Sequence, residues 1–463
     1  MFSYILLQLL YAIVLFILWY IIAANALRVI TVFIAAVVTP AGIEKARSFE
    51  SRLMGKSKNM IPISLLVPAY NEEKRIVESI KAMLNLNYVN FEIIVINDGS
   101  SDRTLEAVVN AFGLQKIIYP VREILATKKI RNIYYNPDIS RLHLIDKERG
   151  GKCDALNAGV NFSGFPCVVS MDADSFPDPD ALLHVVKAFM KDKYTIAAGG
   201  IVRVANGCTF RDGKMVKAGL PKKILPLFQV IGYLRSYVAG RIIWNGVNSL
   251  LSVSQPFGAF QKAALLAVGG FTVGAESGEM DLIVKLHRYM RSRKYVYRIC
   301  FLPELVCWAH APESFAGLFN ECRRQQIGLM DVLGRNRDMF FGRKYGLPGS
   351  LALPYYFFFE MISPFMETLG IFIVPLAWFF GLLSLDALAL FLASVLTFGI
   401  FASIGAIASE DFTRARNLKI PELLALGFIS IFENIFYRPI VTVFRLVGAL
   451  SYRKQKNPRD PAK

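Results

Sequence analysis

The stretch VVSMDADSFPDPDAL (168–182) joins an apolar run to a cluster of aspartates. The run CVVSMD (167–172) is short and mostly apolar, which predicts a strand buried on both faces. Asp172 and Asp174 stand two residues apart where the chain leaves this strand. Carboxylates in such a place are hard oxygen ligands, suited to Mg²⁺ or Mn²⁺ shared with phosphates. A lone pair of this kind is more often a solvated loop, so its surroundings decide its meaning.

Strands and helices alternate around this stretch through residues 61–310. Strands are predicted at ISLLVPAY (63–70), FEIIVIND (91–98) and LHLID (142–146), with helices at 72–86, 102–112 and 153–162. Apolar strands separated by helices predict an α/β fold with a mostly parallel sheet. Ligands bind such sheets at the carboxyl ends of the strands. The polar motifs VPAYNEE (67–73), NDGSSD (97–102) and MDADS (171–175) all fall there.

The start of the chain has a different character. Residues 4–27 carry no charge, and the run exceeds the roughly 20 residues that span a bilayer. It lacks the basic start and the cleavage site of a signal peptide. We therefore predict an uncleaved N-terminal transmembrane anchor within residues 1–40.

The C-terminal third is also apolar and is interrupted by basic segments. Its apolar stretches are 351–383, 385–408 and 420–450, and its basic segments are 334–346, 414–419 and 452–463. The positive-inside rule places all three basic segments in the cytoplasm, which two spans satisfy. Arginines recur at about double-turn spacing along 437–453, which favours an amphipathic helix on the membrane surface. The alternative is a third span whose basic tail breaks the rule.

The overall charge is basic, with 463 residues carrying a net charge of +17 and 54% hydrophobic residues. A basic chain can bind nucleic acid or a membrane surface. The basic clusters flank the apolar segments, so we predict a lipid bilayer as partner and no nucleic acid. The six cysteines show no CxxC or metal-site spacing, which indicates free thiols in a reducing compartment.

The order of the polar motifs carries more information than any one of them. VPAYNEE, VINDGSSDRT (95–104), GGKCDALNAGV (150–160) and SMDADS (170–175) resemble, in that order, the inverting family-2 glycosyltransferases with a GT-A fold. The flanking apolar helices narrow the resemblance to the processive synthases of cellulose, hyaluronan, chitin oligosaccharide and poly-N-acetylglucosamine. The resemblance implies an inner or plasma membrane protein with a cytoplasmic GT-A domain at 60–345. It also implies transmembrane or interfacial helices at 350–450 and a basic cytoplasmic tail at 451–463.

By this resemblance, three residues would hold the donor nucleotide. Tyr70 and Glu72, in the loop after the first strand, would contact the base, and Asp98, at the end of the second strand, would contact the uridine. The alternatives without a role in binding are a plain turn for Tyr70 and Glu72 and a helix cap for Asp98.

The diphosphate end of the donor would be held by the next motifs. Lys152 follows two glycines, which let backbone approach a ligand, and its ammonium could pair with the diphosphate. The alternative is an ordinary surface lysine. Asp154 belongs to the same loop and helix start. Asp172 and Asp174 would share Mg²⁺ or Mn²⁺, with Asp174 the stronger candidate for direct ligation.

The chemistry also needs a general base. Family members carry a T-E-D or G-E-D triplet with the final Asp as base, and SGEMDL (277–282) aligns Ser277, Gly278 and Glu279 with that triplet. The resemblance therefore predicts Glu279 as base, one methylene longer than usual. Asp281 is the fallback, although an acid in a first helical turn is favoured there without any catalytic role.

The acceptor motif departs further from the family. Q-x-x-R-W aligns with ECRRQ (321–325), so Arg324 stays while Glu321 and Gln325 replace Gln and Trp. By resemblance Arg324 contacts the diphosphate, and the missing Trp removes an aromatic sugar platform. His310 stands where many relatives have Glu. These changes put the acceptor, and processive polymerisation, in doubt.

Two acids fall inside the predicted membrane region. Glu360 and Glu367 interrupt an otherwise apolar stretch. Acids at membrane depth face a protein interior or a polar pathway. They could therefore pack within the protein or line an acceptor or polymer channel.

The sequence as a whole predicts transfer of a sugar from a UDP-sugar to a growing β-glycan or to a lipid or saccharide acceptor, with inversion. The resemblance adds polysaccharide-export partners. The alternative is a non-catalytic subunit or sensor that binds nucleotide sugars, which Gly278 and Gln325 favour and Glu279 and Arg324 oppose. The motifs do not specify the sugar or the linkage.

Overall fold

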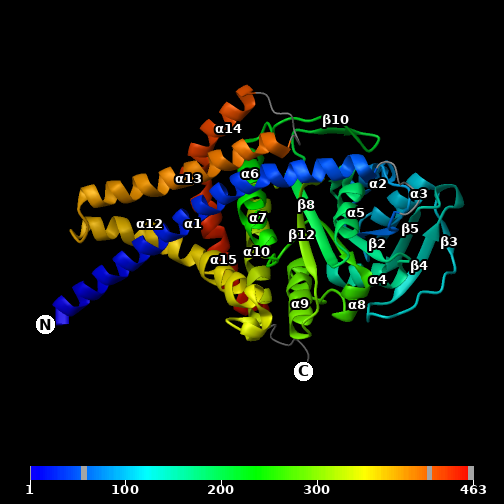
Figure 1. The fold of residues 1–463 in the computed structure, drawn as a ribbon, viewed down its shortest axis with the longest axis horizontal. Coiled ribbons are helices and arrows are strands. Elements are labelled where there is room, and N and C mark those ends of the chain that lie inside the picture. Colours follow the sequence, from blue (N-terminus) through cyan, green and yellow to red (C-terminus); the bar gives the residue numbers. More distant parts are fainter. Residues whose placement is uncertain (1, 54–59, 414–419, 457–463) are drawn as a thin grey trace.

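The computed structural model describes residues 2–53, 60–413 and 420–456 (Figure 1). The predicted basic segment 414–419 and the final part of the predicted tail, 457–463, lie outside the described residues. A sheet with flanking helices forms one side of the molecule, and long apolar helices form the other (Figure 1).

The central sheet has ten strands in the order β3-β4-β5-β2-β1-β6-β11-β8-β12-β7. Its strands are β1 (Ile63–Ala69), β2 (Phe91–Asp98), β3 (Gln115–Ile117), β4 (Ile130–Tyr135), β5 (Leu142–Lys147), β6 (Cys167–Met171), β7 (Phe176–Pro177), β8 (Thr195–Val204), β11 (Phe257–Gln261) and β12 (Arg298–Ala309). The neighbours β5, β2, β1 and β6 are parallel, which confirms the predicted parallel sheet at its centre. On the far side of β6, β11 runs antiparallel to both β6 and β8. A separate hairpin pairs β9 (Thr209–Arg211) with β10 (Lys214–Lys217).

Helices cover the sheet because its central strands are apolar on both faces. They are α2 (Ile76–Leu84), α3 (Thr104–Phe112), α4 (Lys152–Phe162), α5 (Ala181–Lys191), α8 (Lys262–Ala267) and α9 (Gly278–Ser292). All of α4 after Lys152 is buried, and the helix packs on β1 and β2. A Cβ built on Gly159 would lie 3.0 Å from Ile96 and 3.1 Å from Leu66. Glycine therefore lets α4 lie close to the strands.

Four helical segments in the described residues are long and apolar enough to cross a membrane: Gln8–Ile34, Pro348–Phe379, Leu385–Ile407 and Pro421–Tyr452. The first lies in α1 (Phe2–Leu53), which extends beyond the predicted anchor. The others comprise η6 (Pro348–Ala352), α11 (Leu353–Tyr355), η7 (Tyr356–Met361), α12 (Ser363–Phe379), α13 (Leu385–Thr413), α14 (Ile420–Phe432), η8 (Glu433–Tyr437) and α15 (Arg438–Lys456).

The last apolar segment, Pro421–Tyr452, runs in a different direction from the two before it (Figure 1). In Figure 1, α12 and α13 run side by side, whereas α14 and α15 run across them. An interfacial helix would take such a direction. The interfacial interpretation of 437–453, the number of spans and the cytoplasmic orientation stay predictions.

A third group of helices lies between the sheet and the apolar helices. It comprises α6 (Ile224–Arg235), η3 (Ser236–Arg241), α7 (Ile242–Gly246) and α10 (Phe315–Arg335) (Figure 1). Helix α10 packs along α15. A Cβ on Gly448 would lie 2.9 Å from the Arg323 Cα, so this glycine allows the two helices to approach closely.

The two acids of the apolar region pair with arginines. A Glu367 oxygen lies 3.0 Å from Arg28 of α1, and its other oxygen accepts from the Thr442 hydroxyl of α15 at 3.0 Å. Glu360 lies 3.6 Å from Arg445. These contacts join α1, α12 and α15, so both charges are engaged in helix packing.

Candidate active site

Two adjoining cavities lie where the parallel strands end. The small cavity, of about 380 Å³, includes Gly150, Lys152, Asp172, Gly278 and Glu279 in its lining. The large cavity, of about 1240 Å³, begins at the Asp172 and Asp174 pair and extends to α15. The two share Asp172 and a stretch of α10 that contains Glu321, Arg324 and Gln325. The predicted metal pair, Lys152, Glu279 and Arg324 are thus brought together from distant parts of the sequence.

Lys152 begins α4 and points its ammonium at Asp172, with which it forms an ion pair. Burial acts to lower the pKa of Lys152, but the Asp172 carboxylate outweighs it and raises that pKa. The preceding Gly151 has φ +90°, a left-handed conformation that favours glycine. The two glycines therefore make the turn that presents a charged lysine to the small cavity.

Acidic groups crowd the start of the large cavity. Burial, then the charges of Asp174 and Asp172, raise the pKa of Glu72 to about 7. Burial and the charge of Asp172 also raise the pKa of Asp174. Arg75 lies 3.5 Å from an Asp174 oxygen and offsets part of this negative charge. A cation bound here would relieve the remaining repulsion.

The donor set fits a metal ion shared with a substrate. Within the described ranges, no group of three or more His, Cys, Asp or Glu side chains is arranged to hold a metal ion by itself. Mg²⁺ is commonly bound by one or two carboxylates together with substrate phosphates and waters. The pair Asp172 and Asp174 meets that requirement, and Asp172 lines both cavities.

Glu279 lies in the first turn of α9, where it is 8% exposed. Its Oε1 accepts from the backbone N–H groups of Val253 at 3.0 Å and Ser254 at 2.9 Å, and from the Ser252 hydroxyl at 3.3 Å. Burial outweighs these bonds and raises the pKa of Glu279 to about 7. A carboxylate with this pKa is well matched to proton transfer near neutral pH.

The fallback base faces elsewhere. Asp281 is 2% exposed and accepts a hydrogen bond from the Thr272 hydroxyl. It is absent from the lining of the small cavity, whereas Glu279 is present. The geometry therefore favours Glu279 over Asp281 as the candidate base.

The glycine of the altered triplet has a steric explanation. A Cβ built at Gly278 would lie 2.3 Å from the Cys153 Sγ. Cys153 is buried in α4 and lies 3.6 Å from the Ala275 carbonyl oxygen. The sulfur thus occupies the space that a side chain at position 278 would need.

Gly278→Ala is expected to lower stability by about 1–3 kcal/mol, the usual cost of overpacking a filled interior. Cys153→Ala should cost less, and the double variant should recover most of the loss because the sulfur is gone. Thermal unfolding of the four proteins measures this coupling. Additive effects in the double variant would show that the two positions do not compete for space.

Asp98 and Asp154 are buried on either side of Lys147, a cation that the sequence motifs do not indicate. The Lys147 ammonium lies 2.8 Å from an Asp98 oxygen and 2.6 Å from an Asp154 oxygen. Asp98 also accepts from the N–H groups of Gly150 at 2.9 Å and Gly151 at 2.7 Å. These contacts fix the turn that carries Lys152. The predicted substrate contacts of both aspartates stay predictions, and the observed bonds give them a positioning role.

A signal for Lys147 existed in the strand pattern. In the parallel register of β2 and β5, Lys147 stands directly beside Asp98. Aligning the ends of the two strands would place Lys147 next to Asp98. Such an alignment predicts a buried pair of opposite charges. The sequence also gave no indication of a partner for Tyr70. The Arg149 guanidinium lies over one face of the Tyr70 ring, 4.2 Å from its centroid.

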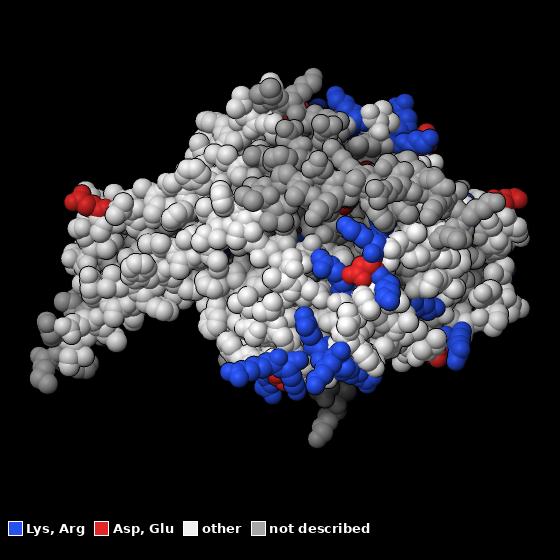
Figure 2. Space-filling model, viewed as in Figure 1, with Lys and Arg blue, Asp and Glu red and all other residues white. Residues whose placement is uncertain are grey.

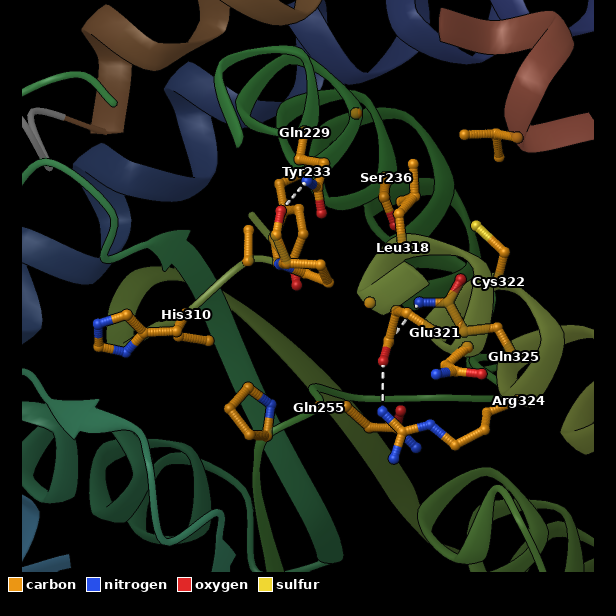
Figure 3. A pocket seen from close by; sticks show the side chains of 18 of the residues that line it. Gln229, Tyr233, Ser236, Gln255, His310, Leu318, Glu321, Cys322, Arg324 and Gln325 are labelled. Atoms are coloured by element: carbon orange, nitrogen blue, oxygen red, sulfur yellow. Dashed lines mark hydrogen bonds and ion pairs between the residues drawn. The ribbon is translucent and has the colours of Figure 1, made fainter. Parts of the chain in front are cut away.

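The altered acceptor motif forms a small network on α10. Glu321 accepts from Arg324 at 2.7 Å and from Gln325 at 2.8 Å (Figure 3). The acid that replaces the family's Gln thus holds the arginine that remains. His310 lies across the cavity, with its Nδ1 3.3 Å from the Asp174 carbonyl oxygen. Figure 3 also shows Gln229 and Tyr233 of α6 along the wall.

The far end of the large cavity is polar and lies among the apolar helices. Its lining there includes Arg235, Glu433, Tyr437 and Arg438. Glu433 accepts from Arg235 at 2.9 and 2.5 Å, and Arg438 donates to Asn25 of α1 at 3.0 Å. Arginines and acids are balanced over the whole lining: the arginines are Arg75, Arg235, Arg241, Arg323, Arg324 and Arg438, and the acids are Asp172, Asp174, Glu276, Glu313, Glu321 and Glu433.

Comparison with known proteins identifies the family of the sheet domain. Residues 64–235 match the family described as glycosyl transferase family 2. The chain thus carries a family-2 glycosyltransferase domain with a GT-A fold, as the motif order predicts.

Particular relatives and one solved structure extend the comparison. A poly-β-1,6-N-acetyl-D-glucosamine synthase of Staphylococcus epidermidis is 28% identical over 63% of this chain and 61% of its own length. Such a synthase of Staphylococcus aureus is 29% identical over 59% of this chain and 56% of its own. The match thus spans about three fifths of these relatives. The mannosyltransferase PcManGT of Pyrobaculum calidifontis, solved with GDP-Man and Mn²⁺, shares the fold with a TM-score of 0.53, 18% identity and coverage of 94% of this chain and all of that one.

Proposed function

We propose that this protein is a membrane-bound, inverting glycosyltransferase that moves a sugar from a UDP-sugar to a hydroxyl of a growing β-glycan. The observation that carries the proposal is the small cavity, where Glu279, Lys152 and Asp172 face one space. We also propose that the GT-A domain lies on the cytoplasmic side of the membrane and that the glycan passes to polysaccharide-export partners.

The donor end of the reaction needs its diphosphate neutralised. Lys152 carries a charge into the small cavity and can pair with phosphate oxygens. Mg²⁺ or Mn²⁺ held by Asp172 and Asp174 would offset the charge of the departing diphosphate. Arg324, held by Glu321 at 2.7 Å, presents a further guanidinium at the boundary of the two cavities.

The acceptor end needs a base. A Glu279 carboxylate oxygen takes the proton as the acceptor hydroxyl attacks the anomeric carbon. The new bond from the anomeric carbon to the acceptor oxygen forms while the bond to the diphosphate breaks, and UDP leaves with that electron pair. Attack from the opposite face of an α-linked donor gives a β-glycoside. Glu279 ends the step protonated and returns the proton to solvent.

The charge balance of the large cavity bears on the acceptor. Apart from the metal pair Asp172 and Asp174, several charges of the lining neutralise one another, as Arg235 does Glu433 and Arg324 does Glu321. Such a polar, paired lining suits a hydroxyl-rich saccharide, which can donate hydrogen bonds to the acids and accept them from the arginines. The names of the relatives make UDP-N-acetylglucosamine and a β-1,6-linked product the first pair to test.

The test is UDP release by the full-length protein in lipid nanodiscs with Mn²⁺, across a panel of UDP-sugars and alongside donor binding. Release with one sugar and a glycan product would establish the transferase and name its donor. Tight donor binding without release, even with added saccharide acceptors, would favour the sensor or subunit alternative. Gly278 and Gln325 are the departures that such a protein would carry.

Asp174→Asn is expected to weaken metal-dependent UDP-sugar binding about tenfold or more, a loss of at least about 1.4 kcal/mol. An amide is a poorer ligand for a hard cation than a carboxylate. Binding titrations with and without Mn²⁺ measure the effect. Asp178→Asn is a matched control from the same loop, because Asp178 accepts from the Asp180 N–H at 3.1 Å and is absent from the lining of both cavities. Unchanged metal dependence in Asp174→Asn would remove the metal assignment.

A further inference from the structure

A third cavity lies apart from the two active-site cavities and shares none of their lining residues. It measures about 460 Å³, and four of its lining side chains are cationic: Arg291, Lys294, Arg343 and Lys344. We call it the basic pocket. It lies between the end of α9, the loop that follows it, and η5 (Arg343–Tyr345). No Asp or Glu is among its lining residues.

One cation of the pocket is fixed by a buried chain of hydrogen bonds. Arg291 donates from Nε to the Tyr297 hydroxyl at 3.1 Å, and that hydroxyl lies 2.6 Å from His287 Nδ1. His287 Nε2 lies 2.7 Å from the Leu250 carbonyl oxygen, which can only accept. Nε2 therefore carries the proton, and Nδ1 accepts from Tyr297. Burial lowers the pKa of His287 to about 4, so the imidazole anchors Arg291 without adding a charge.

The backbone around the pocket leaves this guanidinium accessible. Gly346 has φ +62°, and a Cβ built there would lie 3.4 Å from Arg291 Nη1. The left-handed φ favours glycine here, and the loop lies in ordinary van der Waals contact with the guanidinium, which still lines the cavity. Lys294 also has a left-handed φ of +58°, which is uncommon for a residue with a side chain and fixes its place at the pocket.

Within the part of the chain that the structure describes, none of the four cations of the pocket forms an ion pair with an acid. Asp338, the acid of the adjoining segment, lies 2.8 Å from Arg288 instead. Lys344 packs its ammonium over the Tyr345 ring at 4.8 Å. Four positive charges around one cavity favour an anion, and guanidinium groups suit phosphate. In Figure 2, Lys and Arg gather at the lower edge of this face, over the region of α9 and the segment after α10.

The surroundings indicate where that phosphate comes from. Large apolar side chains beside the pocket face solvent: Tyr295 is 53% exposed, Val296 71%, Phe341 65% and Leu347 43%. Pro348, two residues beyond Gly346, begins an apolar segment long enough to span a membrane. Basic and apolar side chains combined at the base of such a segment suit the headgroup level of a bilayer.

We propose that the basic pocket binds the phosphate headgroup of an anionic membrane lipid and so docks this side of the sheet domain on the bilayer. Arg291 and Arg343 contact the phosphate oxygens, and the exposed apolar side chains contact the acyl region. The site is separate from the donor and acceptor cavities. The proposal therefore stands whether or not the protein transfers sugar.

The test is native mass spectrometry of the full-length protein, delipidated in a neutral detergent and titrated with phosphatidylglycerol or phosphatidylcholine. The wild type should retain phosphatidylglycerol in preference. A variant with Lys294→Gln, Arg343→Gln and Lys344→Gln should bind it about tenfold more weakly or worse, because each cation near a membrane surface contributes to the attraction. These three side chains are exposed, so the variant should fold.

The matched control changes the same charge at three exposed positions outside the pocket, with Lys116→Gln, Lys191→Gln and Arg131→Gln. It should bind phosphatidylglycerol within about twofold of wild type. Equal losses in the two variants would mean general charge attraction and would overturn the pocket. Displacement of the lipid by millimolar inorganic phosphate or glycerol phosphate would identify a soluble anion as the ligand and overturn the lipid assignment.

Discussion

Glu279→Gln is expected to abolish sugar transfer while the donor still binds. The Gln side chain keeps an oxygen that can accept from the Val253 and Ser254 N–H groups, so the local geometry survives. An amide cannot take the proton of the acceptor hydroxyl, and losing a positioned base costs about 10²- to 10⁴-fold in rate. UDP release measures transfer, and calorimetric titration measures donor binding. Asp281→Asn is the control, because that side chain bonds to Thr272 and faces away from the cavity.

The pH dependence of the wild type gives a second readout of the same group. The active base is the ionised form, so transfer should rise as the pH passes through about 7, the pKa that burial gives Glu279. Any residual rate of Glu279→Gln should lack this rise. Wild-type turnover in Glu279→Gln would move the base assignment to Asp281.

Stability should show the opposite trend. A buried carboxyl with a raised pKa binds its proton more tightly in the folded state. Its contribution is complete below the ordinary pKa of 4.5 and is lost as the pH rises towards about 7. Above that pH, Glu279→Gln should unfold at a higher temperature than the wild type, and this advantage should shrink in acid.

Lys147→Met is expected to destabilise the protein by about 3–5 kcal/mol, the usual cost of removing one partner of a buried ionic cluster. Lys147 is fully buried, and its ammonium lies within 2.8 Å of Asp98 and 2.6 Å of Asp154. Met has a similar length and leaves both carboxylates uncompensated. Thermal unfolding in nanodiscs checks the loss.

A second substitution distinguishes charge from packing. Asp154→Asn removes one of the two stranded charges, while Asp98 keeps the Gly150 and Gly151 N–H groups. The double variant with Lys147→Met should therefore recover a large part of the stability. A double variant as unstable as the single one would mean that the lysine stem, and not its charge, supports the fold.

Motifs that follow central strands were the most predictable part of this molecule. Asp98 and Asp172 end or follow buried parallel strands, so strand pattern alone places them at one edge of the sheet. The resemblance to the family predicted Glu279 as the base. It did not predict the hydrogen bonds that Glu279 accepts, because the Val253 and Ser254 amides come from a loop without a recognisable sequence pattern. The antiparallel insertion of β11 between β6 and β8 also escaped prediction, since strand order depends on tertiary packing.

The other features that could not be predicted from the sequence depend on contacts between distant segments. Cys153 and Gly278 compete for one space across more than a hundred residues, and neither position signals the other. Lys147 is read as a surface lysine unless the strand register is known. The basic pocket joins the end of α9 to residues some fifty positions later, so its cations read separately as ordinary surface charges.

The wall of the large cavity has a consequence for how this protein is divided into parts. Glu433, Tyr437, Arg438 and Val441 enclose a space that starts at Asp174, although they belong to the last candidate span of the chain, Pro421–Tyr452. A chain ending at residue 345 would keep the sheet, Lys152 and Glu279 but lack this wall. Catalytic domain and membrane helices are therefore not interchangeable modules. Under the proposed function, residues of both parts line the space for the acceptor, so exchanging the C-terminal helices between relatives would transfer part of the acceptor preference.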